Sequence, residues 1–154
     1  MNSTNLHHLC EVEREKWPNP NLIADPSGRL WDPFRRKWVA GTPEEFVRQH
    51  SLRRLMLEAQ CPPESIAVER GLTVHGRAKR FDAVVFRQGT PWMLVECKAP
   101  QIALNDAVCL QWMRYNLPLG AAWGWITNGV RDRIFTADGR ELPPDLPQFG
   151  TFAL

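Results

Sequence analysis

The chain has 154 residues, of which 44% are hydrophobic and 23% are charged, and its formal net charge at pH 7 is +2. This length and composition predict one soluble globular domain, and the small net charge excludes nucleic-acid binding through overall charge alone, although a local basic patch would suffice. No stretch approaches the roughly 20 apolar residues of a membrane span and the N-terminus is unlike a secretory signal, so we expect a cytoplasmic protein without a membrane partner.

The cysteines predict reduced thiols. There are four of them, and they are neither closely paired, as in a zinc site, nor dense, as in a secreted disulfide scaffold. His7, His8 and Cys10 could bind a metal, but no second pair of ligands follows them. We therefore do not expect a zinc site.

The first part of the chain is polar and contains several prolines. It predicts a short helix at 6–16 and then an irregular segment. Residues 29–40 carry two short apolar patches around Asp32 and Pro33, which predicts a small hairpin with the proline in its turn.

A helix is predicted next, from residue 42 onward. Thr42 is a good N-cap, Pro43 suits the first helical position, and Glu44 and Glu45 lie in the first turn, where the helix dipole favours anions. The prolines at 62–63 must end the helix. The residues expected to face the core are Phe46, Val47, Leu55, Met56 and Leu57.

Strands are predicted at 65–76, 79–86 and 91–98, which are rich in β-branched and aromatic residues and separated by glycine-containing turns. Residues 101–116 predict a second helix, ended by Pro118 and Gly120. Its apolar residues near helical spacing are Ala103, Ala107, Leu110 and either Met113 or Tyr115.

The last elements are a strand at 121–129, an edge strand at 130–135, a turn at 136–139, and a proline-rich tail that is either draped over the domain or loose. A helical connection allows the strands at 91–98 and 121–129 to be parallel. The fold class is therefore α/β (α+β), with a central mixed β-sheet flanked by helices. The predicted organisation is an N-terminal extension at 1–28, a domain at 29–140 and a tail at 141–154.

Two acidic residues lie at the ends of neighbouring predicted strands. If 79–86 and 91–98 form a hairpin centred on Gly89, Phe86 faces Trp92, Val84 faces Leu94, and Asp82 faces Glu96 at a Cβ separation of about 5 Å. A bulge would shift this register by one residue. Both faces of the hairpin are apolar up to these charges, so the strands should be central.

Two carboxylates that converge in a partly dry site favour a cation between them. Oxygen ligands that leave room for water suit Mg²⁺ or Mn²⁺ better than zinc. Lys98 shares the face of Glu96, because side chains on a strand repeat every two residues. The alternative is a solvated Glu96 and Lys98 pair at a strand end, with Asp82 at an exposed edge; the apolar ladder leading into the charges argues against it.

This set of residues resembles the PD-(D/E)xK nuclease superfamily, with Asp82 and Glu96-Cys97-Lys98 at the motif positions. More closely, "TPEEFVRQH", "KRFDAVVF", "LVECKAP", "QWMRYN" and "ITNG" resemble the N-terminal domain of the restriction subunit of type I restriction enzymes. The resemblance covers about residues 29–135 and implies a restriction-endonuclease-like fold. The proline that precedes the aspartate in the superfamily is replaced by Phe81.

The resemblance implies roles for individual residues. Asp82 and Glu96 would bind Mg²⁺ or Mn²⁺, Lys98 would assist the attacking water, and a glutamate of the first helix would complete the site. Glu45 is the first choice for that glutamate and Glu44 the second. Cys97, the middle residue of the motif, belongs to the same candidate metal-binding set.

A further set of residues is expected to bind DNA or to support the site. Gln111 and Tyr115 match the QxxxY motif of related nucleases and, four residues apart, project from one helix face. The alternative for this pair is a core tyrosine beside a solvated glutamine. The basic candidates for phosphate contacts are Arg77, Lys79, Arg80, Arg114, Arg131 and Arg133. Asn128 and Gly129 are assigned only a turn role.

The expected function is that of a Mg²⁺-dependent DNA endonuclease domain of a restriction-modification system. The sequence contains no GxxxxGK[ST] phosphate-binding loop, so no ATPase motor is expected in it. The expected partners are DNA and either a second copy or other restriction or defence subunits. The alternatives are a catalytically silent nuclease fold that binds DNA or protein, and an unrelated α/β domain.

Overall fold

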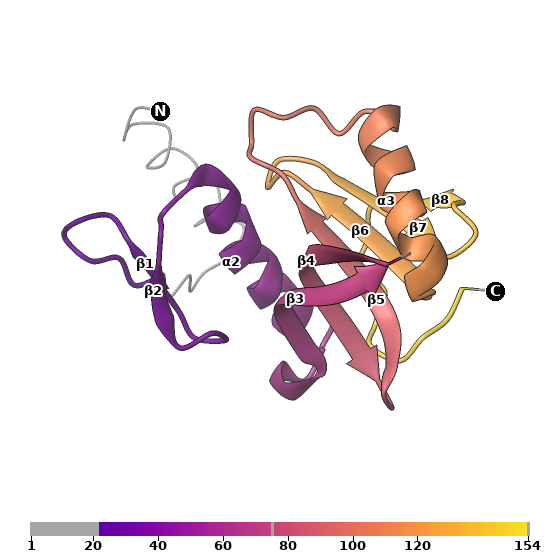
Figure 1. Cartoon of the computed structure of the whole chain (residues 1–154), viewed down its shortest axis with the longest axis horizontal. Coiled ribbons are helices and arrows are strands. Elements are labelled where there is room, and N and C mark those ends of the chain that lie inside the picture. Colours follow the sequence, from indigo (N-terminus) through magenta and orange to yellow (C-terminus); the bar gives the residue numbers. More distant parts are fainter. Residues whose placement is uncertain (1–21, 75, 154) are drawn as a thin grey trace. The chain divides into compact units, whose positions relative to one another are not determined.

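The computed structural model describes residues 22–74 and 76–153, and the predicted helix at 6–16 lies outside them, as do His7, His8 and Cys10. The elements shown in Figure 1 are β1 (Leu30–Asp32), β2 (Lys37–Val39), α2 (Pro43–Leu57), the short 3₁₀-helix η1 (Pro63–Ser65), β3 (Ile66–Val74), β4 (Arg77–Arg87), β5 (Thr90–Cys97), α3 (Asp106–Leu119), β6 (Trp123–Thr127), β7 (Asp132–Thr136) and β8 (Glu141–Leu142). The chain divides into two compact units between Pro43 and Glu44. The domain limits predicted from the sequence stay a prediction.

The smaller unit contains the predicted hairpin. β1 and β2 pair antiparallel, and Pro33 lies in the turn between them. The carboxylate of Asp32 accepts hydrogen bonds from the backbone N–H groups of Phe34 and Arg35 and so shapes this turn.

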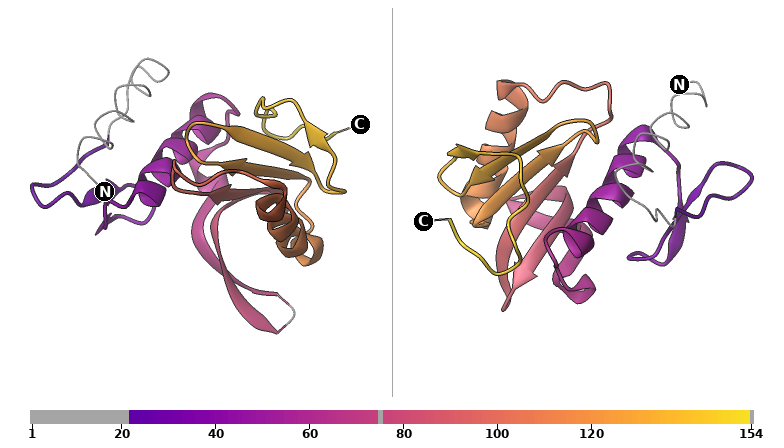
Figure 2. Two further views of the ribbon diagram at one scale, coloured as in Figure 1. Left: turned by 90° about the horizontal axis from the view of Figure 1, so that it is seen from above. Right: turned by 180° about the vertical axis from the view of Figure 1, so that it is seen from behind.

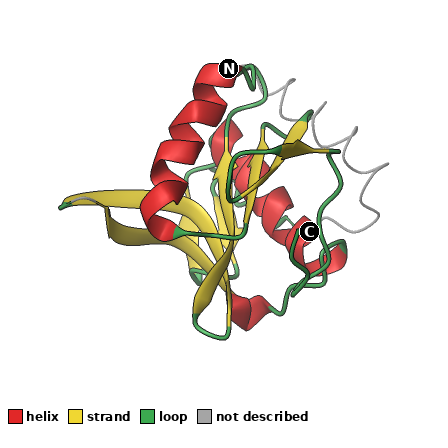
Figure 3. Ribbon diagram, turned by 90° about the vertical axis from the view of Figure 1, so that its right-hand side faces the viewer, coloured by secondary structure: helices red, strands yellow, loops and turns green. Residues whose placement is uncertain are grey.

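The larger unit contains the mixed sheet. Its strand order is β3-β4-β5-β6-β7-β8, and only β5 and β6 are parallel, joined by α3 as predicted. α2 and α3 cover opposite faces of the sheet (Figure 2). β3 and β4 continue beyond the other strands as a two-stranded hairpin (Figure 3). The mixed sheet with flanking helices confirms the predicted fold class.

The register of β4 and β5 confirms one part of the prediction and corrects another. Val84 faces Leu94 as predicted, but a bulge after Val85 pairs Phe86 with Pro91 rather than with Trp92. The cause is the turn: Gln88 and Gly89 both have positive φ, 51° and 75°, which is typical of a two-residue hairpin turn. Such a turn pairs Arg87 with Thr90 and Phe86 with Pro91. Beyond the bulge, the strands return to the predicted register, in which Val84 faces Leu94.

α3 begins later and ends later than predicted. Asn105 is its N-cap and accepts a hydrogen bond from the N–H of Val108, so the helix starts at Asp106 rather than near residue 101. Pro118 lies inside its last turn, and Gly120, with φ of 71°, ends it. This helix buries Cys109, Trp112 and Asn116, whereas Leu110 is exposed.

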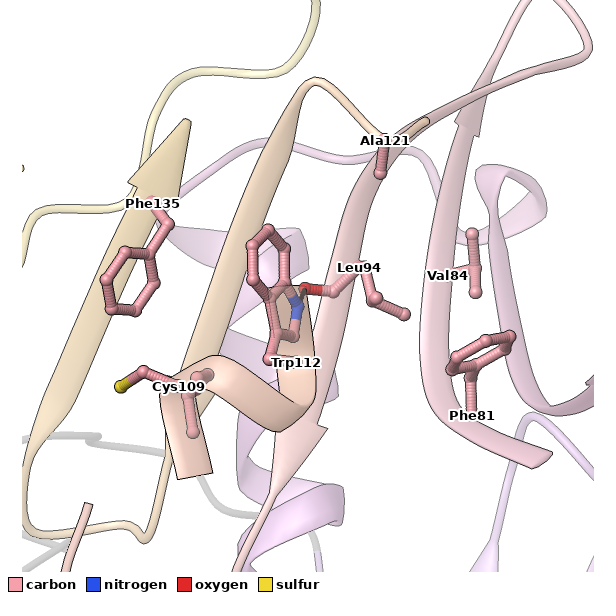
Figure 4. Packing of buried hydrophobic residues seen from close by; sticks show 8 residues of the cluster. Phe81, Val84, Leu94, Cys109, Trp112, Ala121 and Phe135 are labelled. Carbon is pink, nitrogen blue, oxygen red and sulfur yellow. Dashed lines mark hydrogen bonds between the residues drawn. The ribbon is translucent and has the colours of Figure 1, made fainter. Parts of the chain in front are cut away.

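Trp112 is the largest buried side chain by which α3 packs on the sheet. Figure 4 shows the Trp112 ring between Leu94 and Phe135. Its Nε1 donates to the carbonyl of Leu94 at 3.3 Å, and its ring stacks on Phe135 with centroids 5.8 Å apart. The same ring lies directly on Gly124 of β6, where a Cβ atom would approach it to 1.9 Å. Only glycine fits at that position of β6.

Two other sequence predictions are wrong in detail. β7 is not an edge strand, because β8 pairs with it. Leu57 is 65% exposed rather than buried, because α2 ends there. The turn role of Asn128 is confirmed, since its Oδ1 accepts the N–H groups of Val130 and Arg131.

The C-terminal segment is draped over the larger unit. The carbonyl of Thr151 accepts the indole N–H groups of both Trp92 and Trp123, at 2.9 and 2.8 Å. The N–H of Phe149 donates to the carbonyl of Ala59 at 2.7 Å. Within the described residues, no helix has the length and apolar character needed to cross a membrane.

Candidate active site

The candidate site lies where β4 and β5 separate. Their ladder ends at the pair Ala83 and Val95, so the predicted direct pairing of Asp82 with Glu96 is not part of it. Instead, Oδ2 of Asp82 accepts the backbone N–H of Cys97 at 2.7 Å. The buried carboxylate therefore replaces a main-chain acceptor, and the two strands part around it.

Arg48 of α2 reaches this carboxylate from one face of the sheet. Its Nη2 and Nε donate to Oδ1 of Asp82, at 2.6 and 3.2 Å. Its Nη1 donates to Glu45 of the same helix and to Glu69 of β3, the latter at 2.9 Å. Burial disfavours the charged guanidinium, but the charges of Asp82 and Glu45 raise the pKa of Arg48. Arg48 is thus a permanently charged cation among three carboxylates.

Glu96 and Lys98 form the second part of the site, as their spacing on a strand predicted. Nζ of Lys98 donates to Oε1 of Glu96 at 3.0 Å, and both side chains are about one-fifth exposed, at 22% and 23%. Burial, and then the charge of Asp82, raise the pKa of Glu96 to about 7. Burial lowers the pKa of Lys98, but the hydrogen bond to Glu96 and the surrounding carboxylates raise it above its ordinary value. Lys98 is therefore an ammonium donor at neutral pH.

The raised pKa of Glu96 has a consequence for stability. Because its folded-state value of about 7 exceeds the ordinary 4.5, its contribution to stability is fully present below pH 4.5 and is lost as the pH rises through 7. We expect the free energy of unfolding of the metal-free wild type to fall relative to that of Glu96→Gln between pH 5 and pH 8, by up to roughly 3 kcal/mol. Urea denaturation of both proteins with a chelator present measures this, and a difference independent of pH would contradict it.

The two glutamates of the first turn of α2 lie in different surroundings. Glu45 is buried and is held by Arg48 and by Nε2 of Gln49, at 2.9 Å in the latter case. The Glu44 side chain is 48% exposed. Burial, and then the charge of Asp82, raise the pKa of Glu44, and Lys98 acts on it as well. Glu44 is therefore a partly exposed carboxylate within electrostatic reach of Asp82 and Lys98, and the choice of Glu45 made from the sequence stays a prediction.

The thiol of Cys97 is buried against α2. Its Sγ lies 3.7 Å from Oγ of Ser51 on α2, and burial raises the thiol pKa well above its usual range. A protonated thiol is a poor ligand for a hard cation. This surrounding does not favour the thiol as a ligand, and the place of Cys97 in the metal-binding set stays a prediction.

Gln111 and Tyr115 do share one face of α3, as predicted. Nε2 of Gln111 and Nζ of Lys79 both donate to the Tyr115 hydroxyl oxygen, at 3.2 and 3.1 Å. These hydrogen bonds, that of Lys79 first, lower the pKa of Tyr115, whereas the charge of Glu96 acts in the opposite direction. The tyrosine ring also packs edge-on against Phe81. The structure thus joins Lys79, Gln111 and Tyr115 into one polar cluster within electrostatic reach of Glu96.

The remaining basic candidates fall into two groups. Arg77, Arg80, Arg114 and Arg131 are exposed. Arg133 is instead paired with Glu141 and Asp106, with an Nη2 to Glu141 distance of 2.7 Å. Arg133 therefore serves the fold, and the exposed arginines remain the candidates for phosphate contacts.

Sequence reasoning missed Arg48 and Glu69. The signal for Arg48 was its position three and four residues after Glu45 and Glu44 on a helix. Glu69 carries no such signal: it falls between the paired residues Val68 and Arg70 of β3, opposite the position of Asp82, with a φ of 48°.

The metal-binding capacity of this site rests on few donors. Within the part of the chain that the structure describes, no group of three or more His, Cys, Asp or Glu side chains is arranged to hold a metal ion. Asp82 and Glu96 offer two hard carboxylates, and Mg²⁺ commonly binds through one or two carboxylates while keeping several waters. Burial first, and then the negative charge of Asp82, raise the pKa of Glu96, and a bound cation would offset the repulsion between these two carboxylates. The donor chemistry fits Mg²⁺ or Mn²⁺, provided that Asp82 can present an oxygen.

Comparison with known families identifies the family of the chain. The family model described as the type I restriction enzyme R protein N terminus matches residues 43–143. The chain belongs to this family. The matched segment runs from the first residue of α2 past β8 and includes every site residue named above. No curated protein and no solved structure matches the chain.

Membership of the type I restriction R N-terminal family confirms the resemblance seen in the sequence. It identifies a nuclease-like domain of the restriction-enzyme type.

Proposed function

We propose that the protein hydrolyses DNA phosphodiester bonds in a reaction that depends on Mg²⁺ or Mn²⁺. The observation that carries this proposal is that Asp82 lies within electrostatic reach of the hydrogen-bonded pair Glu96 and Lys98, in a chain of the type I restriction R N-terminal family. Asp82 is buried, whereas Glu96 and Lys98 are partly exposed. A substrate can therefore reach Glu96 and Lys98 from the solvent side.

Asp82 and Glu96 would hold the cation, with Glu44 as a third carboxylate close to both. When bound, such a cation lowers the pKa of a coordinated water and stabilises the charge that develops on phosphoryl oxygens. The pKa of Glu96 is about 7, so its carboxyl group is partly ionised at neutral pH. The ionised form would add a second negative charge to that of Asp82. The pairing with Lys98 fixes its position on β5.

Lys98 acts as a donor rather than as a base. Its raised pKa keeps the ammonium charged, so it cannot remove a proton from water at neutral pH. A charged donor beside the scissile phosphate neutralises a non-bridging oxygen and gains strength as the phosphorane-like charge develops. Its hydrogen bond to Glu96 aims it into the site before substrate arrives.

The polar cluster of Lys79, Gln111 and Tyr115 would bind the DNA backbone next to the reacting phosphate. Lys79 supplies the positive charge, and the tyrosine hydroxyl and the glutamine amide supply directional hydrogen bonds. The exposed Arg80 and Arg114 would add sequence-independent phosphate contacts. We propose DNA and other subunits of a restriction-modification system, or a second copy of the chain, as partners, and the cytoplasm as the location.

Cleavage assays test this proposal. Single-stranded, double-stranded and branched DNA are incubated with the protein in Mg²⁺, in Mn²⁺ or in chelator. We expect cleavage only with metal, and a loss of roughly 10²- to 10³-fold in rate in Lys98→Ala. Lys37→Ala, which removes an exposed lysine of β2, is the matched control and should keep the wild-type rate. Cleavage that needs no metal, or that is equally fast in Lys98→Ala, would refute the assignment.

A second candidate is a catalytically silent nuclease fold that binds DNA. One observation favours it: both oxygens of Asp82 already accept hydrogen bonds, from Arg48 and from Cys97. This alternative predicts retention of DNA in gel-shift assays that is unchanged by chelator, with no turnover of any substrate.

A further inference from the structure

Arg48 is the most densely paired side chain of the candidate site. Its side chain is only 8% exposed, and it contacts Asp82, Glu45 and Glu69, with Glu44 further away at 3.9 Å. The guanidinium presents several N–H donors in a rigid planar fork, which allows it to serve several carboxylates at once. One cation therefore balances the negative charge contributed by three different elements, α2, β3 and β4.

The two oxygens of Asp82 accept hydrogen bonds from different kinds of donor, one from the backbone and one from a side chain. Oδ2 accepts the Cys97 N–H, which belongs to the backbone of β5, a central strand. Oδ1 accepts only side-chain donors of Arg48 among the hydrogen bonds described. A divalent cation that coordinates Asp82 would meet the charged guanidinium at Oδ1, and like charges repel strongly in a partly dry site. Of the two donors, the arginine side chain is the one that can give way.

Glu69 and Glu45 provide a place for Arg48 once it leaves Asp82. Both bind Nη1, whereas Asp82 binds Nη2 and Nε. Release of Asp82 therefore need not leave a buried, unpaired charge, which would be strongly destabilising. Glu69 adopts positive φ, 48°, a backbone conformation that is unfavourable for a non-glycine residue. Its ion pair with Arg48 is an interaction that helps to offset this strain.

We propose that Arg48 is the resident counter-ion of the metal-free site: it holds Oδ1 of Asp82 until a divalent cation takes that oxygen, and Glu45 and Glu69 then retain it. This inference rests on the proposed metal-dependent function. Arg48 is therefore a positioning residue. It holds the carboxylates together in the absence of metal, and it releases Asp82 when the metal binds. Its removal should thus weaken the metal-free fold and strengthen metal binding.

Calorimetric titration with Mn²⁺ tests the competition. We expect Arg48→Gln to bind Mn²⁺ about tenfold more tightly than the wild type, because the competing cation is gone. Glu69→Gln should bind it several-fold more weakly, because Arg48 loses an alternative partner and holds Asp82 more firmly. In the double variant, the affinity should equal that of Arg48→Gln, because the proposed effect of Glu69 on metal binding is transmitted by Arg48, whereas another ion partner of Glu69, Arg80 at 3.8 Å, is exposed.

A second measurement does not depend on the folding of Arg48→Gln. In ¹⁵N-labelled wild-type protein, the Arg48 Nε–H resonance is assigned by its absence from the spectrum of Arg48→Lys. Diamagnetic Mg²⁺ at saturation should shift this resonance as its bond to Asp82 is lost. An unmoved resonance at saturation would overturn the inference.

The outcomes separate this inference from the proposed function. If neither the wild type nor any variant binds Mn²⁺, the proposed metal-dependent function fails, and the competition fails with it. If the wild type binds Mn²⁺ but Arg48→Gln binds it more weakly, or Glu69→Gln binds it as tightly as the wild type, only the role of Arg48 is overturned.

Discussion

Asp82→Asn should abolish metal-dependent DNA cleavage, by roughly 10³-fold or more, while the chain remains folded. The amide keeps the size of the carboxylate, and its oxygen can still accept the Cys97 N–H, the hydrogen bond that spans 2.7 Å in the wild type. It removes the negative charge that a divalent cation requires. Arg48 keeps its bonds to Glu45 and Glu69, so the loss of stability should be about 1–3 kcal/mol. Cleavage rates and urea denaturation measure the two effects.

Asp132→Asn is the matched control for this substitution. Asp132 is also a nearly buried carboxylate that pairs with an arginine of α2, since it accepts Nη1 of Arg54 at 2.9 and 2.8 Å. It also accepts Nε1 of Trp125 at 3.1 Å, and it contacts none of the candidate metal ligands in the hydrogen bonds described. Asp132→Asn should thus lose comparable stability and keep its cleavage activity. Equal losses of activity in the two variants would mean that Asp82 acts through stability alone.

Gly124→Ala should have the largest effect on folding. The added Cβ would lie 1.9 Å from Cζ2 of Trp112 and 2.4 Å from two further ring atoms, and the ring is fixed by its stacking on Phe135 and its hydrogen bond to Leu94. Relief requires α3 to move away from the sheet, so we expect a loss of roughly 3 kcal/mol or more, or no folded protein. Thermal and urea denaturation measure it.

Two variants show whether the cause is this contact. Gly71→Ala, at an exposed position of β3 with no atom within 4 Å of the added Cβ, should change stability little. The double variant Gly124→Ala with Trp112→Leu should regain part of the stability that Gly124→Ala loses, because the smaller side chain makes room. If Gly124→Ala is as stable as Gly71→Ala, the packing of α3 on β6 has been described wrongly.

Much of the sheet was predictable because side chains on strands alternate with a period of two. The apolar runs of β4 and β5 fixed the facing of Val84 with Leu94, and the helix between β5 and β6 allowed their parallel pairing. The bulge at Val85 was not predictable from the apolar pattern, because it follows from the positive φ values of Gln88 and Gly89. The start of α3 was misjudged because it depends on the cap at Asn105, and its buried face follows Cys109, Trp112 and Asn116, which are also at helical spacing, rather than Leu110.

The candidate site was predicted in part for the same reason. Glu96 and Lys98 are two residues apart on one strand, so their contact is local. The partners of Arg48 lie 21 and 34 residues away, on β3 and β4, and no local pattern in the sequence links them. The backbone conformation of Glu69 is also uncommon for its residue type. The metal-binding residues thus came from local spacing and family resemblance, whereas the counter-ion came only from the structure.

The central claim is that Asp82 and Glu96 bind one divalent cation together. The most direct test is a crystal of the protein soaked in Mn²⁺, examined by anomalous diffraction. We predict one anomalous peak within roughly 2.5 Å of a carboxylate oxygen of each residue, with the Arg48 guanidinium withdrawn toward Glu69. Clear electron density for both side chains, with no peak between them and the bond from Arg48 to Asp82 intact at saturating Mn²⁺, would contradict the claim.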